Sequence, residues 1–149
     1  TFEEITTAFP RLIPGLLDHP GIGFLMVRSE DHGCLVIGEA GINYLDHTTI
    51  EGTDPLANYG PNAARHLKRT DGFSNAPDIL VMSAWDPAVG TISAFEELVG
   101  SHGGLGGTQT EPFIFHPTSL SAPAEPIVGA ASLHAVMNTW ADAARENRS

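Results

Sequence analysis

Residues 22–38 read IGFLMVRSEDHGCLVIG and contain two apolar runs separated by a polar pentapeptide. The first run, residues 22–28, has the β-branched and aromatic content typical of a β-strand. Residues 34–38 have the same character, and residues 29–33 between them have turn-forming chemistry. A third short strand is expected over residues 42–45. These segments together predict an antiparallel meander.

Helical patterns flank this meander on both sides. Residues 2–18 carry apolar side chains at helical spacing in two pieces, and residues 62–68 predict a short helix. An apolar stripe predicts a terminal helix from about residue 130 to 146 that packs on the sheet. Residues 78–83, DILVMS, predict a buried strand at the sheet centre. This order predicts a single α/β domain over residues 1–149, with a mixed or largely antiparallel sheet flanked by helices.

The composition excludes several classes of function. The chain has 149 residues and a formal net charge of −11, so binding to nucleic acid or to an anionic membrane through a basic patch is not expected. Its one cysteine, Cys34, cannot form a disulfide within the chain. No apolar run reaches the roughly 18 residues that a membrane span needs. We therefore expect a soluble segment, cytoplasmic by default.

The most unusual stretch is GSHGGLGG, residues 100–107, where five glycines surround His102. Glycine accepts positive φ and lets the backbone approach another group closely, so a histidine in such a loop can face a ligand with little obstruction. The alternative is a flexible surface loop with a solvent-exposed histidine. The loop is not a phosphate-binding P-loop, because no Lys-Ser or Lys-Thr follows the glycines.

PDILV at residues 77–81, followed after about twenty residues by GSHGG at 100–104, resembles the C-terminal signature of the alkaline phosphatase superfamily. The similarity is to the type I phosphodiesterase/nucleotide pyrophosphatase-like branch. QTEPF at 109–113 and HPGIG at 19–23 resemble its bacterial, often membrane-associated, members. The resemblance implies that His102 is the last histidine ligand of a two-metal site. The metals implied are divalent, with zinc favoured by histidine and aspartate ligands.

The resemblance also implies that the chain is the C-terminal part of a larger hydrolase of small phosphate esters or phosphodiesters. The family's first aspartate, its Ser or Thr nucleophile and its remaining ligands are not identifiable here, so the chain alone should be inactive. Its partner would be the missing N-terminal catalytic portion, and the face left uncovered should favour self-association. The alternative function is a non-catalytic binding or regulatory module with the same half-fold.

EDHG at residues 30–33 is similar to the family's Ser-Asp-His-Gly motif, which would make Asp31 and His32 metal ligands. The alternative is that these residues form the hairpin turn between two strands. A third hypothesis is a self-contained mononuclear site built from Asp31, His32 and His102. The other histidines lack the spacing of a local metal site, and we expect structural or solvent-exposed positions for them.

Overall fold

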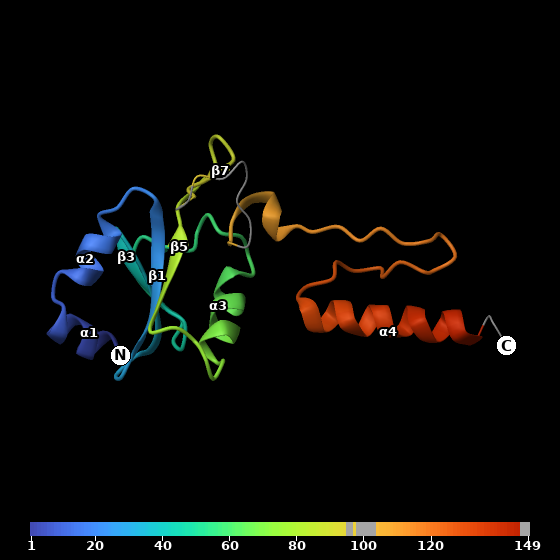
Figure 1. Cartoon of the computed structure of the whole chain (residues 1–149), viewed down its shortest axis with the longest axis horizontal. Coiled ribbons are helices and arrows are strands. Elements are labelled where there is room, and N and C mark those ends of the chain that lie inside the picture. The colour runs from blue at the N-terminus through green and yellow to red at the C-terminus, as the bar shows by residue number, and fades with distance from the viewer. Residues whose placement is uncertain (95–96, 98–103, 147–149) are drawn as a thin grey trace. The chain divides into compact units, whose positions relative to one another are not determined.

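A computed structural model describes residues 1–94, 97 and 104–146 of the chain. Contacts between Cα atoms divide the chain into two units, residues 1–112 and residues 113–149, which are described separately below. Among the residues that the structure describes, the first unit contains both sheets and four helical segments, and the second contains one long helix (Figure 1).

The first unit is built on a five-stranded sheet in the order β4-β3-β2-β1-β5, in which every pair of neighbours is antiparallel. The antiparallel meander predicted around residues 22–45 is therefore confirmed. The strands are β1 (Ile22–Ser29), β2 (Gly33–Gly38), β3 (Gly41–Tyr44), β4 (Thr49–Gly52) and β5 (Ile79–Ser83). The sequence predicts no strand at β4, whose four residues are all exposed and form no apolar pattern.

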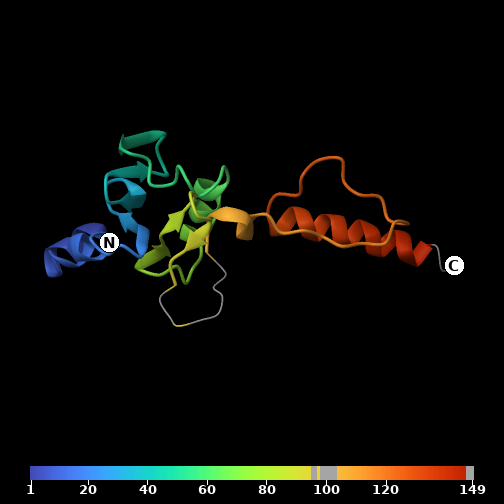
Figure 2. The same ribbon diagram turned by 90° about the horizontal axis from the view of Figure 1, so that it is seen from above.

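Helices cover both faces of this sheet, as Figures 1 and 2 show from two directions. Helices α1 (Phe2–Ala8) and α2 (Leu12–Leu17) lie on one face, and α3 (Ala63–Asp71) lies on the other. Side chains of β1 alternate between the two cores: Phe24 and Met26 pack with α3, whereas Leu25 and Val27 pack with α1 and α2. Because both faces are covered, β1 and β2 read as nearly continuous apolar runs.

The prediction that residues 78–83 lie at the sheet centre is wrong, because β5 is at one edge of the sheet and pairs with β1 alone among the strands that the structure describes. Its apolar run has another physical cause. Leu80 and Met82 pack against the α3 core, and Ile79 packs against the α1 and α2 core. A strand covered on both faces is apolar whether it is central or at an edge.

A close contact holds the end of β5 against β1. The register between the two strands shifts at Gly23, and a Cβ atom at that position would overlap the Tyr59 hydroxyl. That hydroxyl donates to the Ser83 carbonyl (3.0 Å) and accepts from the Trp85 N–H (3.3 Å). The buried Tyr59 therefore fixes where β5 ends and where the following hairpin, β6 (Trp85–Asp86) and β7 (Thr91–Ile92), begins.

The second unit contains α4 (Ala130–Glu146), with the bounds predicted from its apolar stripe. The Trp140 indole N–H donates to the Ser121 carbonyl (2.9 Å), and the Trp140 ring lies 4.7 Å from that of His116. No residue described in this unit is buried. The packing of α4 on the sheet stays a prediction. None of the helices that the structure describes has the length and apolar character needed to cross a bilayer.

Candidate functional site

The described end of the glycine-rich segment packs against the indole ring of Trp85. Gly106 and Gly107 have φ values of 100° and 61°, which favour glycine over residues with a side chain. A Cβ atom on Gly107 would lie 2.5 Å from the Trp85 ring, and one on Gly106 would lie 2.9 Å from it. These two glycines are therefore required by backbone conformation and by close packing, and the short helix η1 (Gly107–Thr110) follows directly.

Further contacts attach this segment to the end of β5. The Leu105 N–H points at the Met82 sulfur (3.4 Å), and the Gln109 side-chain amide donates to the Leu105 carbonyl (3.2 Å). On the N-terminal side of the segment, the Ser93 N–H donates to the Ala84 carbonyl (2.9 Å). Both described stems of the loop that contains His102 thus meet the chain at residues 82–85. His102 itself lies outside the described residues.

Asp31 and His32 form the hairpin turn between β1 and β2, as one of the two alternatives predicted. The Ser29 hydroxyl accepts hydrogen bonds from the backbone N–H groups of both residues, at 3.2 and 3.0 Å. The same hydroxyl donates to the Glu3 carboxylate (2.6 Å), which ties the turn to α1. The His32 ring packs edge-on against Tyr44, with ring centroids 5.4 Å apart. Local hydrogen bonding accounts for this turn without a ligand.

Among the described residues, no group of three or more His, Cys, Asp or Glu side chains is placed to hold a metal ion, and His102 lies outside those residues. His19 instead accepts a hydrogen bond from the Gly21 N–H (3.0 Å), and His134 lies beside Asn138 on α4. Zinc or another divalent metal stays a prediction for this chain.

A network of charged side chains, which the sequence did not reveal, lies at the C-terminal end of α3. The buried Asp71 carboxylate binds the Arg28 guanidinium (2.8 Å) and the Lys68 ammonium (3.0 Å). Lys68 also binds Asp46 at 2.5 Å, and Asp46 accepts the Cys34 N–H (2.8 Å). The hydrogen bond from Lys68, followed by that from the Cys34 backbone, lowers the pKa of Asp46. The four charged side chains come from residues 28, 46, 68 and 71, so no local motif marks them.

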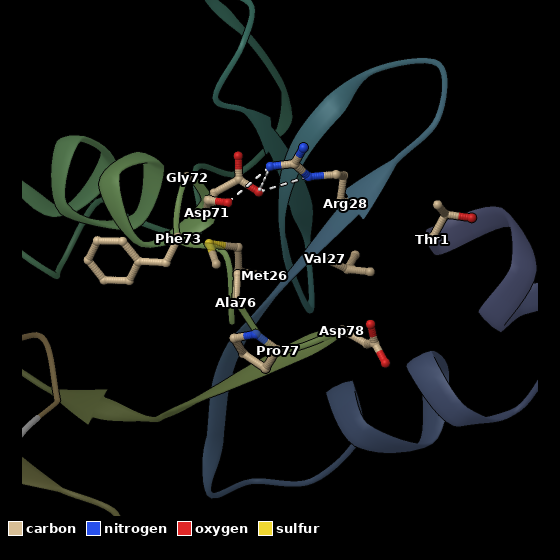
Figure 3. Close-up of a pocket in the computed structure, with 10 residues that line it drawn as sticks. All are labelled: Thr1, Met26, Val27, Arg28, Asp71, Gly72, Phe73, Ala76, Pro77 and Asp78. Carbon is tan, nitrogen blue, oxygen red and sulfur yellow. Dashed lines mark hydrogen bonds and ion pairs between the residues drawn. The ribbon is translucent and has the colours of Figure 1, made fainter.

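An open cavity of about 520 Å³ adjoins this network. Figure 3 shows Arg28 and Asp71 along one wall, and Pro77 and Asp78 along another. The Arg28 guanidinium is already engaged, because its Nε and Nη2 atoms donate to Asp71. The wall is therefore built by interactions that hold β1 to α3. None of the ten lining residues is a histidine or a cysteine, the side chains that most often bind zinc.

Comparison of the chain with family models, with curated proteins and with solved structures gives no match.

Proposed function

We propose that this chain is the C-terminal part of a metal-dependent hydrolase of phosphate esters or phosphodiesters. In this hypothesis His102 supplies one metal ligand, and the remaining ligands and the nucleophile come from a preceding catalytic portion. A small phosphate ester would be the substrate of the complete protein. The proposal rests on the resemblance carried by residues 77–81 and 100–104.

The structural observation that supports it is the attachment of the glycine-rich loop. A metal ligand must be held in one position, because coordination geometry tolerates little displacement. The described stems provide such a support: Ser93 bonds to Ala84 on one side, and Gly106 and Gly107 pack on Trp85 on the other. A flexible surface loop needs no packing of this kind at its base.

The chemistry expected of such a site follows from general principles. Paired divalent metals stabilise both the attacking and the leaving oxygen at phosphorus. A neutral imidazole is a suitable ligand, and its second ring nitrogen is usually held by a carboxylate or carbonyl group. The part that this chain would supply is the imidazole of His102 and the rigid base of its loop.

The test is a comparison of metal content and hydrolysis in a longer protein that contains this chain and its preceding portion. His102→Ala should remove one metal per chain and reduce hydrolysis of an aryl phosphate or phosphodiester by at least about a hundredfold. His47→Ala, at an exposed position in the turn before β4, is the matched control and should keep the wild-type metal content and rate of hydrolysis. Unchanged metal content and rate in His102→Ala would contradict the proposal.

The chain by itself offers a second test. We expect no tightly bound metal and no hydrolysis, because the other ligands and the nucleophile are not identifiable in it. One zinc per isolated chain, measured by elemental analysis and lost in His102→Ala, would support the mononuclear hypothesis instead. Absence of metal from the longer protein as well would favour the non-catalytic binding or regulatory module.

A further inference from the structure

The two edges of the five-stranded sheet differ in their protection. Strand β4, at one edge, has four exposed residues, one of which is the charged Glu51. Strand β5, at the other edge, has five residues, ILVMS, with no charge, proline or glycine. Edge strands of soluble proteins are usually short, charged or covered, because an open apolar edge pairs with other strands. By this criterion β4 is protected, whereas the residues that the structure describes leave β5 unprotected.

The open side of β5 has unused bonding capacity. Among the residues that the structure describes, no backbone–backbone hydrogen bond reaches residues 79–83 from outside the β1–β5 ladder. The central residue, Val81, is 40% exposed although its neighbours along the strand are more covered. Alternation places Val81 on the face of α1 and α2, because Leu80 and Met82 pack on the α3 face. The strand therefore presents both backbone groups and apolar side chains to a partner.

We propose that the open edge of β5 pairs antiparallel with β5 of a second copy of this chain, with the two-fold axis at Val81. Such an interface is isologous, so each copy presents the same surface and the assembly closes at two. This inference is independent of the proposed function, since it uses neither His102 nor a metal.

A second copy is the partner that the side chains fit. In this register Val81 faces Val81 of the second copy, and Leu80 faces Met82, so apolar side chains oppose each other on both faces. Because the pairing is antiparallel, the two copies of Asp78, which directly precedes the strand, lie at opposite ends of the interface. For a chain with a net charge of −11, an uncharged strand lets two copies approach with less repulsion than an acidic surface would.

The first experiment compares two lysine substitutions by sedimentation over a wide concentration range. The wild-type chain should move towards twice its 15.8 kDa mass as concentration rises, in the micromolar range or above because a five-residue strand pair is a small interface. Val81→Lys places two like charges across the two-fold axis and should weaken association by about tenfold or more. Ile50→Lys, at a 48% exposed position on β4, is the matched control and should associate like the wild type.

A second experiment gives a positive signal and does not depend on weakened association. Val81→Cys should form a disulfide-linked dimer under mild oxidation, because residues facing each other across an antiparallel pair have Cα atoms about 4.5–5.5 Å apart. Cys34 should not compete: it is fully buried, and burial raises the pKa of its thiol to about 12. Ile50→Cys is the control and should stay monomeric at the same concentration.

A mass of one chain at every concentration would overturn the proposal, because β5 would then not pair with a second copy. Equal cross-linking of Val81→Cys and Ile50→Cys would also overturn it, because random collisions would then explain the dimer. Circular dichroism of all four variants separates lost pairing from lost folding.

Discussion

The two ends of strand β1 are joined to their surroundings by different chemistry. At the Ile22 end, Gly23 leaves room for the Tyr59 hydroxyl. The Trp85 N–H donates to that hydroxyl, and the Trp85 ring, in the β6–β7 hairpin, packs against Gly106 and Gly107. At the Ser29 end, Arg28 joins the network formed by Asp71, Lys68 and Asp46. The first end depends on shape and the second on charge.

This difference indicates which conditions each end should tolerate. Close packing between glycines and aromatic rings is insensitive to salt and pH but fails when a methyl group is added. Ion pairs tolerate changes of shape but weaken as a partner is neutralised or screened. The described stems of the segment that contains His102 are attached at the end governed by shape.

The largest effect is expected for Gly107→Ala. The added methyl group would enter the Trp85 ring at 2.5 Å, in a backbone conformation with φ of 61° that alanine disfavours. We expect the free energy of unfolding to fall by about 2–4 kcal/mol, the sum of the backbone cost and the overpacking. Urea denaturation followed by tryptophan fluorescence measures this change.

Gly90→Ala is the matched control for that substitution. Gly90 has a similar φ of 70°, but its added Cβ would lie 4.0 Å from the same tryptophan ring, an ordinary contact. Gly90→Ala should lower the free energy of unfolding only through the unfavourable backbone conformation, by about 1–2 kcal/mol. When Trp85 is also replaced by alanine, Gly107→Ala should lower the free energy of unfolding by no more than Gly90→Ala does. An unchanged cost there would show that the ring is not the obstacle.

The sequence predicted individual strands and helices better than the contacts between residues that are distant in the chain. The strands of residues 22–38 and the helix of residues 130–146 follow from local apolar patterns, which depend only on neighbours in the chain. The glycines of residues 100–107 also mark a special backbone, although their contact with Trp85 was not foreseen. Contacts of that kind depend on the tertiary fold, which a local pattern does not contain.

The edge position of β5 and the charged network escaped prediction for a related reason. An apolar run reports that both faces of a strand are covered, but it says nothing about how many neighbours the strand has. In the charged network, Lys68 of α3 binds both Asp71 and Asp46. Its partner Asp46 lies 22 positions away in a segment that reads as an ordinary turn.

A smaller effect is expected for Asp71→Asn at the charged end. The substitution keeps the shape of a side chain that is only 7% exposed, but removes the charge that binds Arg28 and Lys68. Both cations stay partly exposed and can be solvated, so the loss of stability should be about 1–3 kcal/mol. Thermal or urea denaturation measures it.

Asp78→Asn provides the comparison for this substitution. Asp78 lines the same cavity (Figure 3) but forms no ion pair with the residues that the structure describes. It should change stability by less than about 0.5 kcal/mol. Added salt should reduce the difference in free energy of unfolding between the wild type and Asp71→Asn. It should leave the loss of stability caused by Gly107→Ala unchanged. A cost for Asp71→Asn that is independent of salt would mean that its packing, and not its charge, is what matters.

The smallest effect is a pH dependence carried by Asp46. Its pKa is lowered in the folded chain by the hydrogen bond from Lys68 and by that from the Cys34 backbone, whereas the unfolded value is about 3.9. The stabilising contribution is therefore fully present above the unfolded pKa, and it is lost as pH falls from about 4 through the folded pKa. The difference in urea midpoint between wild type and Asp46→Asn should accordingly shrink between pH 7 and pH 3. Lys68→Met should remove most of this pH dependence, because the main cause of the lowered pKa is then gone. A difference that persists unchanged at pH 3 would show that the Asp46 carboxylate contributes through its shape, and the contrast between the two ends of β1 would fail at this residue.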